Sequence, residues 1–82
     1  RRAMSWKIQQ INALFERLTP RERQVMAMLV SGLANKEVAY RLSISERTIE
    51  VHRRAIMQKM TVKSFAELVR AAAMLGFGSS PG

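Results

Sequence analysis

Hydrophobic residues recur along this chain at intervals of three and four positions, the repeat of an α-helix that buries one side. The repeat predicts helices over residues 3–17, 20–31, 46–60 and 65–75, and a shorter one over 36–42. A helix as short as 36–42 is not stable alone in water, so this segment must pack on its neighbours. The pattern predicts an all-α fold with a core of four helices and an additional N-terminal helix.

Residues that favour helix ends mark the expected boundaries. Thr19 precedes Pro20 and lies three residues before Glu22, an arrangement that predicts a capping box at the start of helix 20–31. Gly32 is expected to end that helix, because glycine readily adopts the left-handed conformation found after helices. We interpret Glu22 as a capping residue rather than a catalytic one, since no second carboxylate or histidine lies at a fixed local spacing. The other expected caps are Asn35, Ser45 and Ser64, the last of which is followed by Glu67.

The N-terminal helix carries an apolar seam along one side. Its residues are Met4, Ile8, Ile11, Phe15 and Leu18, with Trp6, Ala13 and Leu14 at the margins. Two interpretations stay open. The helix either packs on its own domain, or it is a linker helix from a further domain or a coiled contact with a second copy. Two heptads are too short to decide between them.

Segment 46–60 divides into a core side and an exposed side. At about 100° per residue, Ile49, Ile56 and Met60 fall together and predict the buried side. The opposite side is a polar stripe that contains one β-branched apolar residue, Val51. Such a side chain suits contact with a thymine methyl group in a DNA groove. The alternative is a solvated charged face with one stray exposed valine. The residues of the exposed stripe are Arg47, Glu50, Val51, Arg54 and Gln58.

The short segment before this helix favours the DNA interpretation. Apolar residues at the fourth, eighth, tenth and fifteenth places from Asn35, with alanine at the fifth, give the helix-turn-helix pattern. Ile44 is expected to point inward from the three-residue turn. Such motifs often have glycine at the ninth place, where this chain has Ser43, so we expect slight strain or a local side-chain hydrogen bond there. The buried stripe of the short helix is expected to be Val38, Ala39 and Leu42.

A resemblance to a known family rests on a longer run, LTPRERQVMAMLVSGLANKEVAYRLSISERTIEVHRRAIMQKMTVKS. This run resembles the DNA-binding domain of LuxR-type regulators, and its TIEVHR core with IMQKM is similar to the FixJ branch of two-component response regulators. The resemblance covers roughly residues 18–75. The expected division is a linker helix over 1–17, a helix-turn-helix DNA-binding domain over 18–76 and a flexible tail over 77–82.

The resemblance also implies roles for individual residues. Glu50, Val51 and Arg54 lie where the family contacts bases. Many relatives have lysine in place of Glu50. Either Glu50 therefore accepts a hydrogen bond from a cytosine amino group, or it points away and Arg47 and Arg54 dominate. The positions expected to face the DNA backbone are Asn35, Lys36, Arg47, Thr48, His52 and Lys59.

Partners follow from the resemblance as well. They are double-stranded DNA, a second copy of the chain on that DNA, RNA polymerase and an N-terminal receiver domain. Dimerisation is expected through the last helix, at Arg70, Ala73 and Met74. The chain contains no aspartate, so it cannot contain the phosphoacceptor pocket of a receiver. We interpret it as the output domain of a bacterial-type transcriptional regulator, cut from a longer protein, which binds duplex DNA sequence-specifically with helix 46–60 in the major groove.

Composition agrees with an anionic partner. Lysine and arginine number 14 against 6 acidic residues, which gives a net charge of +8. Residues 64–82 contain only Glu67 and Arg70 as charged groups, so the last helix suits protein contact better than nucleic acid. The aromatic residues are scattered and form no stacking platform for single-stranded RNA.

Catalytic and metal chemistry find little support. His52 is the only histidine and has no cysteine or aspartate to join it, so we expect neither an enzyme, nor a metal site, nor a cofactor. The longest apolar stretch is far below a membrane span, and the absence of cysteine fits an intracellular, cytoplasmic protein. The remaining alternative is a helical protein-interaction module, for example one contacting RNA polymerase, without DNA specificity of its own.

Overall fold

The computed structural model describes the backbone of residues 2–77 and the side chains of residues 5–77. This part of the chain forms five α-helices and no strand, which confirms the all-α prediction of four core helices and an N-terminal helix. Within it, no helix is both long enough and apolar enough to cross a membrane. The helices are α1 (Arg2–Phe15), α2 (Pro20–Val30), α3 (Asn35–Leu42), α4 (Glu46–Lys59) and α5 (Phe65–Met74).

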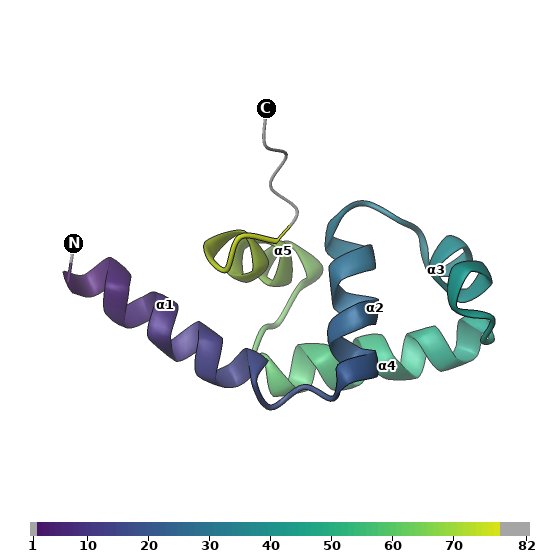
Figure 1. The fold of residues 1–82 in the computed structure, drawn as a ribbon, viewed down its shortest axis with the longest axis horizontal. Coiled ribbons are helices and arrows are strands. Elements are labelled where there is room, and N and C mark those ends of the chain that lie inside the picture. The colour runs from purple at the N-terminus through teal and green to yellow at the C-terminus, as the bar shows by residue number, and fades with distance from the viewer. Residues whose placement is uncertain (1, 78–82) are drawn as a thin grey trace.

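Helix α4 is the element on which the others are arranged. Helices α2 and α3 both pack on it, α2 across its middle and α3 over its N-terminal end (Figure 1). Helix α5 contacts α2 and α1, and α1 extends away from the other helices toward the N-terminus (Figure 1). One long side of α4 is therefore left uncovered by other helices.

The side of α4 that was predicted as core is buried. Ile49 and Ile56 are fully buried and Met60 is 2% exposed. Phe65, the first residue of α5, is half-buried and packs on the margin of the core. The other fully buried side chains are Val25, Met26 and Leu29 of α2, Val38 of α3, and Leu68 and Ala72 of α5, with Leu29 at 2%.

Helix α1 packs on its own domain in the single chain. Ile11 of the predicted seam is buried, and Ile8 and Phe15 are half-buried. The side chain of Met4 lies outside the described residues. Trp6, placed at the margin of the seam, is instead 62% exposed, because it falls on the side of α1 that faces away from Ile11.

Side-chain caps begin three of the helices as expected. The Thr19 hydroxyl accepts the Glu22 N–H at 3.1 Å and the Glu22 carboxylate accepts the Thr19 N–H at 2.9 Å, which completes the capping box. The Ser45 hydroxyl accepts the Thr48 N–H at 3.0 Å. At the start of α5 the Ser64 hydroxyl accepts the Glu67 N–H, but the Glu67 carboxylate bonds the N–H of Lys63 rather than that of Ser64.

Asn35 does not cap α3, contrary to prediction. Ala34 occupies the N-cap position, and Asn35 is the first residue of the helix. Its side-chain oxygen instead lies 3.5 Å from a guanidinium nitrogen of Arg53 on α4. The predicted start of α3 is therefore one residue too late, within the usual uncertainty of helix ends.

Each of the helices α2 to α5 is followed by a residue in the left-handed conformation. Two of the four are glycines, and the other two bound α4, with Ser43 shortly before it and Thr61 shortly after it. The residue after each of them donates its backbone N–H to the carbonyl of the residue five positions earlier, as in the Schellman motif. Ser43 thus takes the strained conformation expected at the ninth place. The four residues are Gly32 (φ 109°), Ser43 (φ 57°), Thr61 (φ 58°) and Gly76 (φ 92°).

Phe77, a residue of the expected tail, is in contact with the first helix. The ring of Phe77 packs on that of Phe15, with centroids 5.1 Å apart, because the backbone turns back at Gly76. Phe77 therefore belongs to the folded domain. Residues 78–82 of the expected tail lie outside the described residues.

Replacing Thr61 with glycine should raise the free energy of unfolding by about 0.5–1 kcal/mol. The left-handed conformation costs an L-residue roughly 1–2 kcal/mol, and the extra freedom of glycine in the unfolded chain offsets about 0.4–1 of that. Urea denaturation measures the change. Gly32→Ala is the converse control and should destabilise the domain, and equal stability for Thr61→Gly would show that the threonine is not strained.

Candidate nucleic-acid interface

The polar stripe of α4 faces solvent, opposite its buried side. Arg47, Glu50, Arg54 and Gln58 are exposed, and Val51 is 52% exposed. The rotation of α4 about its axis is therefore as the sequence predicted. The stripe offers two guanidinium groups, a carboxylate, an amide and one branched apolar side chain, the set of groups that reads hydrogen-bonding edges and methyl groups in a DNA major groove.

The N-terminal end of α4 is held by local hydrogen bonds. The Ser45 hydroxyl accepts the Thr48 N–H, and the two hydroxyl groups lie 2.9 Å apart. Ile44 is half-buried against the core, which confirms its inward direction. The backbone bond from the Ile44 N–H to the Ala39 carbonyl closes the turn after α3. The helix-turn-helix geometry thus presents the first turns of α4 at the exposed end of the domain.

A cleft lies on the flank of the stripe. It has a volume of about 440 Å³ and brings Asn35 of α3 beside Glu50 and Arg54. Arg53 and Met57 complete its lining. Lys36 is exposed near this end of α3, and His52 is half-buried. The structure thus gathers Asn35 with two of the expected base-contacting residues, while the contacts of all these residues with DNA stay predictions.

Arg53 was not singled out from the sequence. The carbon at the centre of its guanidinium group lies 4.5 Å from the centre of the Phe65 ring. Its position between the exposed stripe and the core of α4 was visible in the helical pattern. Its aromatic partner was not, because Phe65 belongs to the next helix and nothing local specifies the contact.

Lys59 has a partner within the domain that the sequence did not predict. Its ammonium lies 2.8 Å from the Glu22 carboxylate, which is also bonded by the Thr19 N–H. Glu22 is 6% exposed and the Lys59 side chain is 33% exposed, so this pair joins the C-terminal end of α4 to the first turn of α2 at the edge of the core. Lys59 was expected to face the DNA backbone. Its ammonium is bonded to Glu22 within the domain, which leaves it less available for a phosphate contact.

The surroundings of Glu22 favour its charged form. Burial raises the pKa of the Glu22 carboxyl, but the hydrogen bonds from Lys59 and the Thr19 N–H lower it, as do the charges of Lys59 and His52. The lowering effects together exceed the effect of burial, so the pKa of Glu22 lies below its ordinary value of 4.5. The carboxylate is thus ionised at neutral pH and serves structure rather than chemistry.

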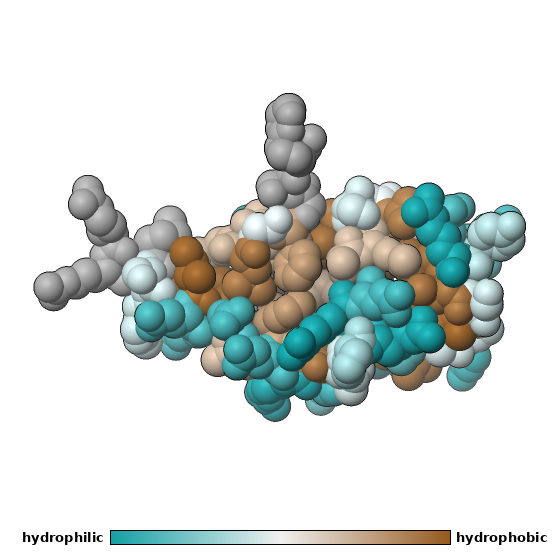
Figure 2. All heavy atoms as spheres, in the orientation of Figure 1, coloured by the Kyte–Doolittle hydropathy of each residue, from teal (hydrophilic) through white to brown (hydrophobic). Residues whose placement is uncertain are grey.

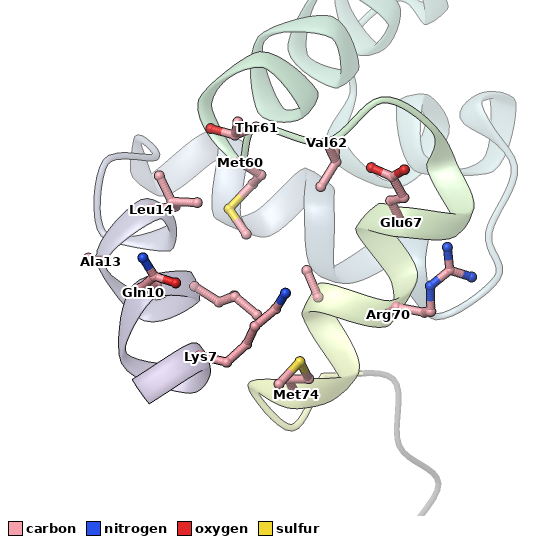
Figure 3. Close-up of a pocket in the computed structure, with 12 residues that line it drawn as sticks. Lys7, Gln10, Ala13, Leu14, Met60, Thr61, Val62, Glu67, Arg70 and Met74 are labelled. Atoms are coloured by element: carbon pink, nitrogen blue, oxygen red, sulfur yellow. The ribbon is translucent and has the colours of Figure 1, made fainter. Parts of the chain in front are cut away.

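The expected dimerisation residues border a groove between α5 and α1. The groove has a volume of about 730 Å³, and its lining includes Arg70 and Met74 on α5 and Lys7 and Leu14 on α1. Met74 lies on the side of Lys7, whereas the guanidinium group of Arg70 points away from α1 (Figure 3). Ala73 is exposed on the adjacent side of α5. Apolar side chains gather over α5 and the adjoining side of α1 (Figure 2). Helix α1 therefore borders the surface through which a second copy is expected to bind.

Two aromatic contacts fix α1 next to this groove. The guanidinium group of Arg23 on α2 lies 5.0 Å from the centre of the Phe15 ring, and it donates to the Glu16 carbonyl at 3.1 Å. The Phe77 ring packs on another side of Phe15. Within residues 5–77 no three histidine or acidic side chains converge to hold a metal ion.

Comparison with known proteins identifies the family of this domain. The family model described as "Bacterial regulatory proteins, luxR family" matches residues 16–72, which include the whole helix-turn-helix. The chain belongs to the LuxR family. It is 53% identical over 70 residues to the transcriptional regulatory protein FixJ of Rhizobium meliloti, a match that covers 85% of this chain and 34% of that protein.

Two solved FixJ structures resemble this LuxR-family domain. The full-length FixJ from B. japonicum superposes with a TM-score of 0.82 at 47% identity, covering 90% of this chain and 36% of that one. The solution structure of the C-terminal transcriptional activator domain of FixJ from Sinorhizobium meliloti gives a TM-score of 0.74 at 52% identity, covering 87% and 90%. The chain spans about a third of the length of the curated relatives it matches.

The comparisons confirm the class of function. The chain is a LuxR-family helix-turn-helix domain of the kind found in FixJ-type response regulators, which are transcriptional regulators that bind DNA. The prediction that it is not an enzyme is confirmed by these relatives. The stripe of α4 lies in the part of the chain that the family model covers.

Replacing Glu22 with glutamine should lower the free energy of unfolding at pH 7 by about 1–3 kcal/mol, since it removes the charge that Lys59 bonds in a buried place. The folded carboxyl has a lowered pKa, so its contribution is complete above 4.5 and is lost as the pH falls below that value. The two proteins should therefore converge in stability in acid. Urea denaturation at several pH values measures this.

Glu67→Gln is a matched control, since that carboxylate also accepts an N–H at a helix start but is more exposed. Its effect at pH 7 should be smaller. An equal loss for the two variants, or a loss for Glu22→Gln that is independent of pH, would contradict the role of the Glu22 charge.

Proposed function

We propose that this domain binds duplex DNA sequence-specifically, with α4 in the major groove and base contacts from Glu50, Val51 and Arg54. The observation that supports this most directly is the half-exposed Val51 in an otherwise polar stripe, opposite fully buried Ile49 and Ile56. An arginine can donate two hydrogen bonds to guanine, a glutamate can accept one from cytosine, and a valine can contact a thymine methyl. Three kinds of base recognition are thus available on one helix face.

Backbone contacts come from the residues around that face. Lys36 and Arg47 are exposed cations in the first turns of α3 and α4. We assign Asn35, Thr48 and His52 to phosphate contacts with less weight, because each is half-buried or already hydrogen-bonded within the domain. Lys59 is the weakest of these assignments, since Glu22 binds its ammonium.

The domain acts within a larger assembly. We propose that two copies pair on DNA through Arg70, Ala73 and Met74 of α5, with residues 1–17 as a linker helix and 18–76 as the DNA-binding domain. An N-terminal receiver domain and contact with RNA polymerase complete the proposal, as does a cytoplasmic location. The length of the curated relatives, about two and a half times that of this chain, supports the additional domain.

Val51→Ala and Arg54→Ala test the base contacts. A preferred site is selected from random duplex DNA, and affinities for it and for random duplexes are then measured by gel shift. Arg54→Ala should weaken binding to the preferred site by about 1–3 kcal/mol, because a bidentate pair to guanine is lost. Val51→Ala should weaken the same binding by less, and on random duplexes it should have little effect. Thermal unfolding of Val51→Ala should be nearly unchanged, since that side chain is outside the core.

Equal losses on specific and random DNA would reassign both residues to the backbone. Absence of any binding to duplex DNA by the unmodified domain would favour the helical protein-interaction module instead.

Lys36→Ala should weaken binding about equally on all sequences and lower the slope of log affinity against log salt by roughly 0.9. The reason is that one phosphate contact, with its released counterion, is lost. Lys63→Ala is the matched control: it removes the same charge near the start of α5 and should leave the slope nearly unchanged. A change of sequence preference with an unchanged slope would place Lys36 among the base contacts.

A further inference from the structure

Arg53 joins three helices at one point. It belongs to α4, its guanidinium group lies over the ring of Phe65 at 4.5 Å, and one of its nitrogens donates to the Asn35 side chain at 3.5 Å. Phe65 is the first residue of α5 and Asn35 is the first residue of α3. A single side chain of α4 thus contacts the first residue of α3 and the first residue of α5.

This arrangement requires an arginine. A guanidinium group is flat, so it can cover an aromatic ring with its face and still donate hydrogen bonds from its edge. A lysine carries the same charge but has no plane to stack. Arg53 is half-buried at the side of the exposed stripe, where the cleft beside Glu50 and Arg54 begins. Its guanidinium group is therefore engaged within the domain rather than directed at bases.

The direction of α5 relative to α4 depends on few constraints. The connection between the two helices runs only from 60 to 64, and Thr61 within it holds the left-handed conformation. Leu68 and Ala72 are fully buried and anchor the middle of α5 in the core. The contact between Arg53 and Phe65 holds its N-terminal end. Helix α5 also packs on α1 and α2, so loss of the contact would leave α5 in the core but is expected to change its angle to α4.

A small tilt has a large effect at the DNA. Val51 lies roughly 15 Å along α4 from Thr61, at about 1.5 Å per residue. A tilt of about 7° between α4 and α5 therefore moves Val51 by roughly 1.8 Å, and the shifts in two paired copies add up to about one base-pair step of ~3.4 Å. If two copies pair through α5, the angle between α4 and α5 sets the distance between the two reading helices.

We propose that Arg53, stacked on Phe65, is a positioning residue that sets the spacing of the two DNA half-sites read by a pair of these domains. The inference rests on the proposed pairing through α5. Arg53 itself contacts neither bases nor phosphates. It determines which spacing is bound, while the stripe of α4 determines which sequence is bound.

The test separates spacing from affinity. A half-site is selected from random duplex DNA with the unmodified domain and is then placed as two inverted copies, with spacers that differ by one base pair. The measured quantity is the ratio of affinities for the best spacing and for its neighbours. This ratio should fall in Arg53→Lys, which loses the flat group stacked on the ring, and in Phe65→Leu, which loses the ring. The fall should be up to about fivefold, the fold-change if the whole of a contact of about 1 kcal/mol favours one spacing. Binding to a single half-site and the salt slope should stay as in the unmodified domain.

Two further variants control for general damage. Phe65→Tyr keeps an aromatic ring under Arg53 and should retain the spacing preference. Arg23→Lys breaks the other stacked arginine of the domain, over Phe15, and should also retain it, because that contact lies between α1 and α2. If Arg53→Lys fails to fold, Phe65→Leu with its tyrosine counterpart still measures the effect.

Each other outcome overturns the proposal. An unchanged ratio in Arg53→Lys and Phe65→Leu contradicts the role of Arg53 in spacing but leaves the proposed pairing through α5 intact. Equal weakening at all spacings, with a salt slope lower by about one, would make Arg53 a phosphate contact. If the unmodified domain binds a single half-site but shows no preference among spacings, the pairing through α5 is wrong and the role of Arg53 fails with it.

Discussion

The packing of one side of α4 against α2 and α3 is the constraint on which the rest of the structure depends. A helix that must offer one face to a groove has only the opposite face with which to hold its place. Ile49 and Ile56 occupy that face without any exposure, and they fix the rotation of the helix about its axis. A turn of the helix by one residue would carry Val51 toward the core and an isoleucine into the solvent. The reading face is therefore defined by apolar packing behind it.

The ends of α4 need support of another kind, because packing of its middle alone does not determine its direction. At the N-terminal end, Ser45 caps the helix and Ser43 turns the chain. At the C-terminal end, Lys59 binds the buried Glu22, which itself caps α2. One carboxylate thus stabilises two helices, so a substitution at the start of α2 would also affect the C-terminal end of α4.

The helices and the rotation of α4 could be predicted from the sequence, because periodicity and capping are local. Thr19 with Glu22, and Ser45, lie within four residues of the groups they bond. The contacts that were missed join residues far apart in the chain. Lys59 and Glu22, Arg53 and Phe65, and Phe15 and Phe77 meet only after the helices have packed. Asn35 illustrates the limit, since its side chain contacts Arg53 rather than capping α3.

The ring pair of Phe15 and Phe77 also concerns how the domain opens. These residues join the first helix to the segment after the last one, and Arg23 of α2 stacks on Phe15. Local unfolding generally releases contiguous groups of contacts together rather than single elements. The two ends of the domain therefore form one cooperative unit. A force or a partner that pulls on α1 should therefore also loosen Phe77, although four helices separate the two along the sequence.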